Sequence, residues 1–170
     1  MDTGLATIQM GLVIIFLLSA VMKLRDLSAF LQLAADYEVL PRRLSAVYGV
    51  LTPFLEIAGA LMLLFPVTRI AGASLLLALL ASFGGAVLAV ILSGREVSCG
   101  CYGKWMESKA DGFTLVKIVL LLLLLVTLLL FPEEAMRLSW PSITLGLLLA
   151  LVFFLLQMIW NYYQENMKLF

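Results

Sequence analysis

FTLVKIVLLLLLLVTLLLF, residues 113–131, is the stretch that decides the fold of this chain. Lys117 is its only charged residue, and nearly all other positions are leucine, isoleucine or valine. A helix that crosses the hydrocarbon core of a bilayer needs roughly 20 predominantly apolar residues. The stretch meets this requirement, so it predicts a membrane-spanning helix that faces lipid.

Four more segments of similar character occur along the chain, at about residues 4–22, 45–65, 70–92 and 142–160. Proline, glycine or charged residues mark the breaks between them. We therefore predict an all-α integral membrane protein, a bundle of about five transmembrane helices built as a four-helix core plus one. The whole chain, residues 1–170, is predicted to form a single transmembrane domain with a cysteine-containing loop at 93–112.

The composition places the chain in the same class. Of its 170 residues, 64% are hydrophobic and only 13% are charged, whereas about a quarter of the residues in soluble domains are charged. Eleven basic residues balance eleven acidic ones, so nothing indicates a nucleic-acid partner. No lysine or arginine precedes the first apolar segment, so we expect that segment to stay as a helix rather than be removed as a signal peptide.

The segment DLSAFLQLAADYEVLP, residues 26–41, predicts a short helix between the first two spans. Its apolar residues recur at helical spacing, which suits a helix lying at the membrane interface. Asp26 is of a type that caps helix N-termini, and Pro41 follows the expected end. Small residues in the third span, in AGAS and ASFGGA, predict close approach of neighbouring helix backbones.

The only two cysteines, Cys99 and Cys101, are separated by one glycine in EVSCGCYGKW, residues 96–105. Their Cα atoms can be at most about 7 Å apart, and disulfides prefer about 4.4–6.8 Å, so a modest bend at Gly100 closes the ring. Such a ring encloses too little chain to stabilise the fold. Strained, exposed disulfides exchange readily, so we predict that Cys99 and Cys101 are redox-active.

Other interpretations of the two thiols stay open. They can be ordinary reduced cysteines, or they can bind a soft metal such as Cu(I) or Hg(II), with Met106 as an auxiliary ligand. Two cysteines without histidine cannot complete a zinc site, and we expect no metal. A soft-metal carrier and a structural membrane assembly factor are kept as alternative functions.

Glu56 lies about halfway along the second span. An ionised carboxylate at that depth costs several kcal/mol unless it is paired or hydrated. Lys117 of the fourth span can pair with Glu56 or extend to the headgroups. Pro53 removes a backbone hydrogen bond and opens room for a ligand or water. We predict that Glu56 either forms a structural ion pair or serves as a third catalytic residue that handles protons near the thiols.

Polar residues of the last span reach the same side of the membrane as the cysteines. Gln157 and Asn161, together with Lys117, are weak candidates for contacts with a quinone cofactor. Trp160, Tyr162 and Tyr163 are expected to form an interfacial aromatic belt that anchors the helix.

Four segments in order resemble the MauE branch of the MauE/DoxX family of redox-associated membrane proteins: SAVMKLRDLSAF, YEVLPRRL, LTPFLEIAGALMLL and REVSCGCYGKW. The resemblance covers roughly residues 10–131, and the cysteine motif is its most specific part. Tyr102 stands where phenylalanine is expected. The resemblance implies a membrane thiol-disulfide oxidoreductase or accessory subunit, exchanging electrons with a thioredoxin-like partner in trans or with a quinone in support of disulfide formation.

The resemblance also implies a multi-pass protein of a prokaryotic plasma (inner) membrane, but two indications disagree on which side the cysteines face. Most basic residues flank the cysteine side, with only Arg69 and Arg137 on the other. The positive-inside rule then makes the cysteine side cytoplasmic. Thiols there are kept mostly reduced, whereas a role in disulfide formation suits the opposite face.

Overall fold

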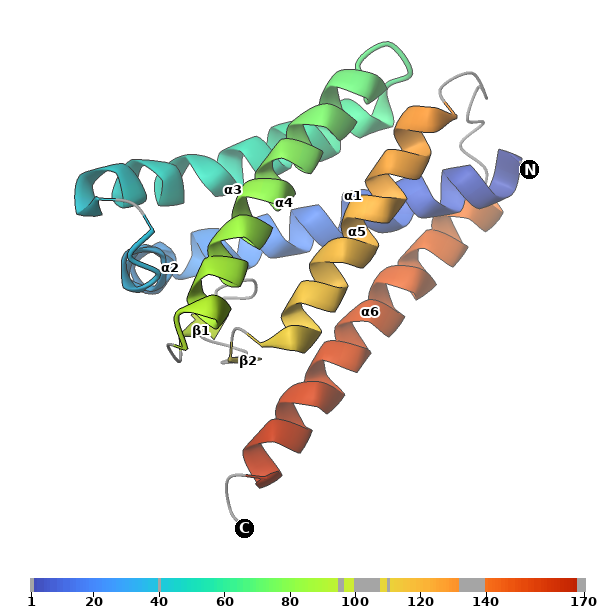
Figure 1. Ribbon diagram of the computed structural model, residues 1–170. Helices are drawn as coiled ribbons and strands as arrows, with labels where there is room; N and C mark the ends of the chain where they lie inside the picture. The colour runs from blue at the N-terminus through green and yellow to red at the C-terminus, as the bar shows by residue number, and fades with distance from the viewer. Residues whose placement is uncertain are drawn as a thin grey trace.

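The computed structural model describes residues 2–39, 41–94, 97–99, 108–109, 111–131 and 140–167. The helices and strands (Figure 1) follow in the order α1 (Asp2–Arg25), α2 (Leu27–Asp36), α3 (Arg42–Leu64), α4 (Arg69–Leu92), β1 (Ser98–Cys99), β2 (Ser108–Lys109), α5 (Gly112–Leu130) and α6 (Trp140–Met167). Five of these helices, α1, α3, α4, α5 and α6, are long and apolar enough to cross a membrane. The prediction of an all-α, multi-pass membrane protein is confirmed.

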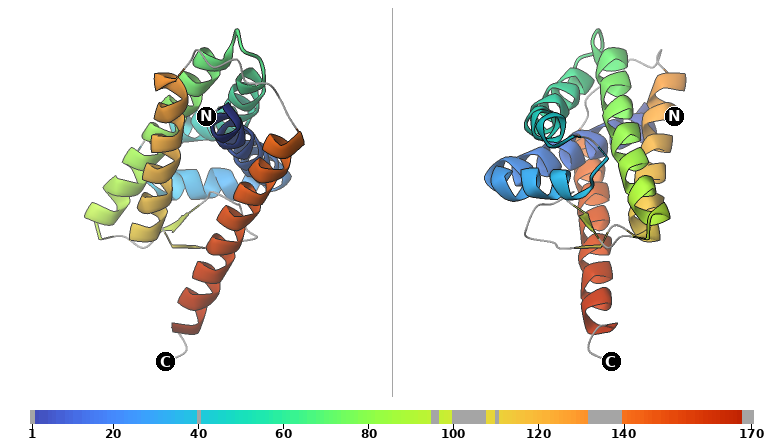
Figure 2. Two further views of the ribbon diagram at one scale, coloured as in Figure 1. Left: turned by 90° about the vertical axis from the view of Figure 1, so that its right-hand side faces the viewer. Right: turned by 60° about the vertical axis from the view of Figure 1, so that its left-hand side comes forward.

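The spanning helices pack in a chain of neighbours that α1 closes. Helix α1 lies against α3, α3 against α4, and α4 against α5, and α1 also touches α5. Helix α6 packs along α1 on the outside of this four-helix core, as Figure 2 shows. The N-terminus lies at the opposite end of the bundle from α2, the two strands and the C-terminus. The cysteine-containing segment therefore shares its end of the bundle with α2.

The short helix α2 forms where the sequence predicted it. The side chain of Asp26 accepts a hydrogen bond from the backbone N–H of Ala29 at 3.2 Å, which satisfies one of the free amides at the helix start. The helix ends at Asp36, and Pro41 caps the start of α3.

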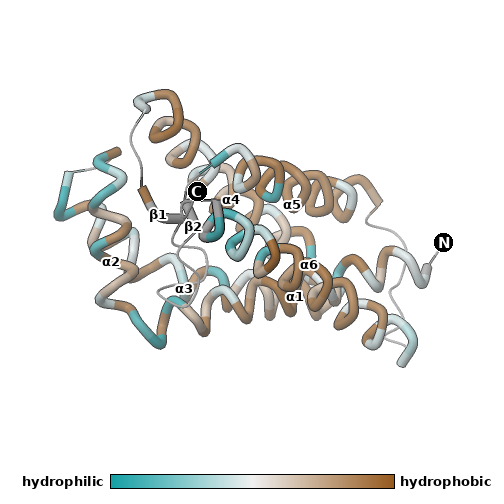
Figure 3. The backbone as a smooth tube through the Cα atoms, turned by 90° about the horizontal axis from the view of Figure 1, so that it is seen from below, coloured by the Kyte–Doolittle hydropathy of each residue, from teal (hydrophilic) through white to brown (hydrophobic). Residues whose placement is uncertain are grey.

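Phe30 is the buried residue of α2, and Leu31 and Ala34 lie close to Gly49 of α3. The exposed positions of α2 are polar, namely Ser28, Gln32 and Asp36. Figure 3 shows that the spanning helices are mostly hydrophobic along their length.

Glycines set the distance between two pairs of helices. A Cβ atom on Gly72 of α4 would lie 2.8 Å from the carbonyl oxygen of Gly59 on α3. A Cβ on Gly146 of α6 would lie 2.9 Å from the backbone nitrogen of Gly11 on α1. The predicted close approach of AGAS is thus confirmed at Gly72. Within ASFGGA, a Cβ on Gly84 would lie 3.0 Å from Ile118 Cγ2 of α5, whereas one on Gly85 would meet no described atom within 4 Å.

Helix α5 buries one stripe of side chains and exposes the rest. The buried residues recur every three or four positions, as a helix packed on one face requires: Thr114, Ile118, Leu121, Leu125 and Leu128. Val116, Leu123 and Leu130 are each more than 60% exposed. These exposed apolar side chains lie on the outer face of a candidate membrane span, the arrangement expected of a helix that faces lipid.

Candidate functional site

The segment that carries the first cysteine leaves α4 through a glycine turn. Ser93 caps α4, and Gly94 follows with φ +67°, a left-handed conformation that glycine adopts without a steric penalty. Cys99 then belongs to β1, where it is the antiparallel partner of Ser108 in β2. The predicted partner thiol, Cys101, lies outside the described residues. The two strands thus bring the ends of the cysteine loop together near the start of α5.

Asp111 anchors the other end of this loop. Its Oδ1 caps α5 by accepting a hydrogen bond from the backbone N–H of Thr114 at 3.0 Å. Its Oδ2 accepts hydrogen bonds from Trp160 Nε1 at 2.9 Å and from Gln164 Nε2 at 2.5 Å. The Trp160 ring also stacks on Phe113, with ring centroids 4.5 Å apart. One carboxylate therefore joins the start of α5 to α6.

An Asp111→Asn variant tests this junction. Asparagine caps helices as well as aspartate does, but its amide nitrogen would face the two donors from α6. We expect a loss of about 1–3 kcal/mol in the free energy of unfolding, the cost of leaving partly buried donors without acceptors. In a background with Trp105→Phe and Trp140→Phe, the emission of Trp160 should shift to the red. Unchanged emission and stability would contradict the role assigned to Oδ2.

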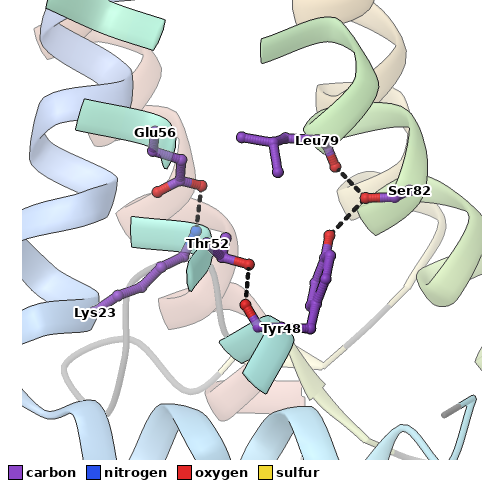
Figure 4. Close-up of polar contacts among 6 residues, drawn as sticks. All are labelled: Lys23, Tyr48, Thr52, Glu56, Leu79 and Ser82. Atoms are coloured by element: carbon purple, nitrogen blue, oxygen red, sulfur yellow. Dashed lines mark hydrogen bonds and ion pairs between the residues drawn. The ribbon is translucent and has the colours of Figure 1, made fainter. Parts of the chain in front are cut away.

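Glu56 is paired, and its partner is Lys23. The ammonium group of Lys23 at the end of α1 donates to Glu56 Oε1 on α3 (Figure 4), and both residues are 6% exposed. The same ammonium lies 5.3 Å from the centre of the Phe30 ring on α2. A structural ion pair was one of the two predicted roles of Glu56. The expected partner, Lys117, was wrong, because α1 crosses α3 closely enough for Lys23 to reach the carboxylate.

The three predicted cofactor-binding residues lie together in a separate hydrogen-bonded chain. Lys117 of α5 donates to Gln157 Oε1, and Gln157 Nε2 donates to Asn161 Oδ1 at 3.2 Å. Gln157 is only 1% exposed. The ammonium group of Lys117, which is half-buried, is bound by an amide oxygen of the bundle. A neutral side chain from α6 thus accepts a hydrogen bond from the ammonium group of a lysine in a spanning helix.

The ion pair and Lys117 line the same cavity, which we call the carboxylate cavity. It has a volume of about 70 Å³, and its polar walls include Lys23, Thr52, Glu56 and Lys117. Glu56 Oε2 is buried and has no hydrogen-bond partner among the described residues. A buried oxygen of this kind normally binds a protein donor, a water molecule or a ligand. Glu56, a lining residue of the cavity, therefore carries one acceptor atom without a partner among the described residues.

Comparison with known proteins settles the family. The family described as "Methylamine utilisation protein MauE" matches residues 1–131 of this chain. The chain belongs to the MauE family. No curated protein and no solved structure matches it.

Helix α6 lies beyond the part of the chain that matches MauE. It nevertheless supplies Gln157 to Lys117 and two donors to Asp111. Trp160, which was expected to anchor the helix at the membrane interface, is half-buried, stacks on Phe113 and donates a hydrogen bond to Asp111. Tyr162 and Tyr163 are exposed, as an interfacial position requires.

Sequence reasoning missed Lys23 as a site residue of this MauE-family chain. Lys23 was treated as one of several basic residues flanking a span. The sequence of α1 carries little signal for it, because nearly all positions of this helix are apolar and no single apolar face stands out. Only the structure shows that Gln9, Phe16 and Lys23 share the buried face of α1. On α3, Tyr48, Thr52 and Glu56 form a stripe at intervals of four.

Proposed function

We propose that this MauE-family membrane protein is a thiol-disulfide oxidoreductase, or the accessory subunit of one, in which Cys99 and Cys101 alternate between dithiol and disulfide. The observation that carries the proposal is the cavity with a buried, half-satisfied carboxylate, in the same bundle that carries the Cys-Gly-Cys motif. Membership of the MauE family agrees with a redox accessory role.

The proposed reaction balances with two partners. When Cys99 and Cys101 form their disulfide, they lose two electrons and two protons. A quinone accepts the two electrons and the two protons and becomes the hydroquinone. The disulfide is then exchanged with the dithiol of a thioredoxin-like protein acting in trans, which becomes oxidised while the two cysteines are reduced again. Glu56 is proposed to accept and release protons during these steps, since it is the described carboxylate that lines the cavity.

The first test traps the thiols of the purified protein. After incubation with a mild oxidant or reductant and rapid alkylation, Cys99 and Cys101 should change state together. A Cys99→Ser, Cys101→Ser variant should lose all ability to oxidise a thioredoxin-like dithiol, while its free energy of unfolding should change by less than about 1 kcal/mol, because so small a ring hardly restricts the unfolded chain.

Three results would contradict the proposal. The first is that the two cysteines never form their mutual disulfide. The second is that the double variant keeps full activity, which would favour a structural assembly factor. The third is stoichiometric Cu(I) or Hg(II) binding that requires both thiols and occurs without redox cycling, which would identify a soft-metal carrier.

We also propose that the protein resides in a prokaryotic plasma membrane. Labelling intact cells with a thiol reagent that does not cross membranes measures which side of the membrane the cysteines face. Labelling of Cys99 and Cys101 in intact cells is expected if the protein forms disulfides outside the cytoplasm. Labelling only after the membrane is permeabilised would agree with the distribution of basic residues.

A further inference from the structure

A second and larger cavity adjoins the carboxylate cavity. It has a volume of about 240 Å³ and lies between α2, α3 and α4. We call it the hydroxyl cavity, because four hydroxyl-bearing residues line it: Tyr37, Ser45, Tyr48 and Ser82. Three residues, Phe30, Tyr48 and Phe83, line both cavities. An occupant of the hydroxyl cavity therefore contacts residues that also line the carboxylate cavity.

The hydroxyl cavity is large enough for an aromatic ring. An engineered protein cavity of about 150 Å³ accepts benzene, and the hydroxyl cavity exceeds this volume. The rings of Phe30, Tyr37 and Phe83 supply aromatic walls. Val39 and Ser82, which also line it, are exposed, so the cavity is open to the outside. A ring can enter there while an attached apolar chain stays in the lipid.

The polar groups between the two cavities offer acceptors rather than donors. Ser82 Oγ donates to the carbonyl oxygen of Leu79 at 2.7 Å, so the 2.5 Å hydrogen bond between Tyr48 and Ser82 takes its proton from Tyr48. Thr52 Oγ1 donates to the carbonyl oxygen of Tyr48 at 2.7 Å. Figure 4 shows Thr52 and Tyr48 below Glu56 on α3, with the Tyr48 hydroxyl directed toward Ser82 of α4.

The acceptor that still needs a hydrogen-bond donor is on Glu56. Its Oε1 accepts from Lys23, and its buried Oε2 has no partner among the described residues. The protons of Tyr48 and Thr52 are already committed, so a ligand that satisfies Oε2 must bring its own donor. A ring hydroxyl does so, and its oxygen can also accept a hydrogen bond from an ammonium N–H on the cavity wall.

We propose that the two cavities form one binding site for a lipid whose head is a hydroxyl-bearing aromatic ring, with the ring in the hydroxyl cavity and a hydroxyl group donating to Glu56 Oε2. This inference rests on the proposed function, in which a quinone accepts electrons from the two cysteines. The ligand of the site is then the hydroquinone form of that electron carrier. Of the residues first predicted to contact a quinone, Lys117 lines the carboxylate cavity, whereas Gln157 and Asn161 are absent from the described walls of both.

The first test measures ligand binding before and after a larger side chain is placed in the wall of the hydroxyl cavity. Decyl-benzohydroquinone and decyl-benzoquinone are titrated into the purified full-length protein by calorimetry. Ala86 lines the hydroxyl cavity, whereas Ala89, three residues later on α4, is exposed and lines neither cavity. Ala86→Leu should weaken hydroquinone binding by at least tenfold, and Ala89→Leu should leave it unchanged. Ala34→Leu, on the α2 wall of the same cavity, should weaken binding as Ala86→Leu does. Unchanged binding in Ala34→Leu would show that Ala86→Leu acts by disturbing the packing of α4 and not by filling the cavity.

A second measurement tests the hydrogen bond to Glu56. Glu56→Gln keeps the size of the side chain but weakens it as an acceptor, because a charged acceptor binds a donor more strongly. The variant should lose roughly tenfold in affinity for the hydroquinone and much less for the benzoquinone. Equal losses for both forms would overturn the assignment of the donor.

The site and the proposed function can fail separately. If neither titrant binds the wild-type protein, or if Ala86→Leu and Ala89→Leu bind equally well, the site is wrong even when the thiols cycle. If the hydroquinone binds as described but Cys99 and Cys101 never form a disulfide, the site stands and the redox function falls. A decyl-phenol that cannot be oxidised should also bind, because the site recognises the hydroxyl group.

Discussion

Replacing Lys23 with leucine is expected to lower the free energy of unfolding by about 3–5 kcal/mol, because it leaves Glu56 buried without its cation. Both residues are 6% exposed, so water cannot easily take the place of the missing ammonium. Glu56→Leu should cost a similar amount, since it leaves the charge of Lys23 uncompensated. Each single variant therefore removes one half of an interaction whose other half stays buried.

The double variant Lys23→Leu, Glu56→Leu distinguishes this explanation from simple loss of packing. Exchanging a whole buried ion pair for apolar side chains is often neutral or stabilising, so the double variant should recover most of the stability lost in either single one. Unfolding in mixed detergent micelles measures all four proteins. Additive losses in the double variant would show that the two charges do not act as a pair.

Lys117→Leu is the matched control for the ion pair. Lys117 lines the same cavity but donates to the neutral amide of Gln157 rather than to a carboxylate. Its loss removes a donor from a neutral amide oxygen and leaves no bare charge, so the expected cost is smaller, about 1–3 kcal/mol. A loss at Lys117 as large as that at Lys23 would mean that burial of the long side chain, and not its charge, sets the cost.

The second large effect is expected at Gly72. In Gly72→Leu the new Cβ would lie 2.8 Å from the carbonyl oxygen of Gly59 and 3.0 Å from the backbone nitrogen of Leu63. These atoms belong to the backbone of α3 and cannot rotate away, so α3 and α4 must separate. Overpacking typically costs about 1–3 kcal/mol, and the contact with backbone on α3 places Gly72→Leu at the upper end.

Gly85→Leu on the same helix is the control for this prediction. Gly85 lies inside α4, and an added Cβ would meet no described atom within 4 Å. Replacing a helical glycine with a better helix former there should raise stability by about 0.5–1 kcal/mol. Thermal unfolding of both variants in the same detergent should therefore show shifts of opposite sign. Equal destabilisation would imply that α4 tolerates no larger side chain anywhere.

Much of the fold was predictable from local sequence, and the site only in part. The last helix illustrates the limit. The span predicted at about 142–160 ends where the hydropathy falls, and α6 continues as a helix to Met167. The polar residues responsible for that fall have partners inside the protein, because Asn161 accepts from Gln157 and Gln164 donates to Asp111. The fall in hydropathy therefore marks the end of the apolar segment and not the end of the helix.

The sequence by itself determined the five spanning helices, the capped helix α2, the presence of a carboxylate at Glu56 deep in a span, and the motif Cys-Gly-Cys as the candidate reactive element. Each of these depends on composition or on spacing along one segment. Only the tertiary structure decided that Lys23 pairs with Glu56, that Gln157 pairs with Lys117, and that two cavities adjoin at Tyr48. These pairings depend on where helices cross. The paired residues are 33 and 40 positions apart in the sequence, so no local pattern predicts that they meet.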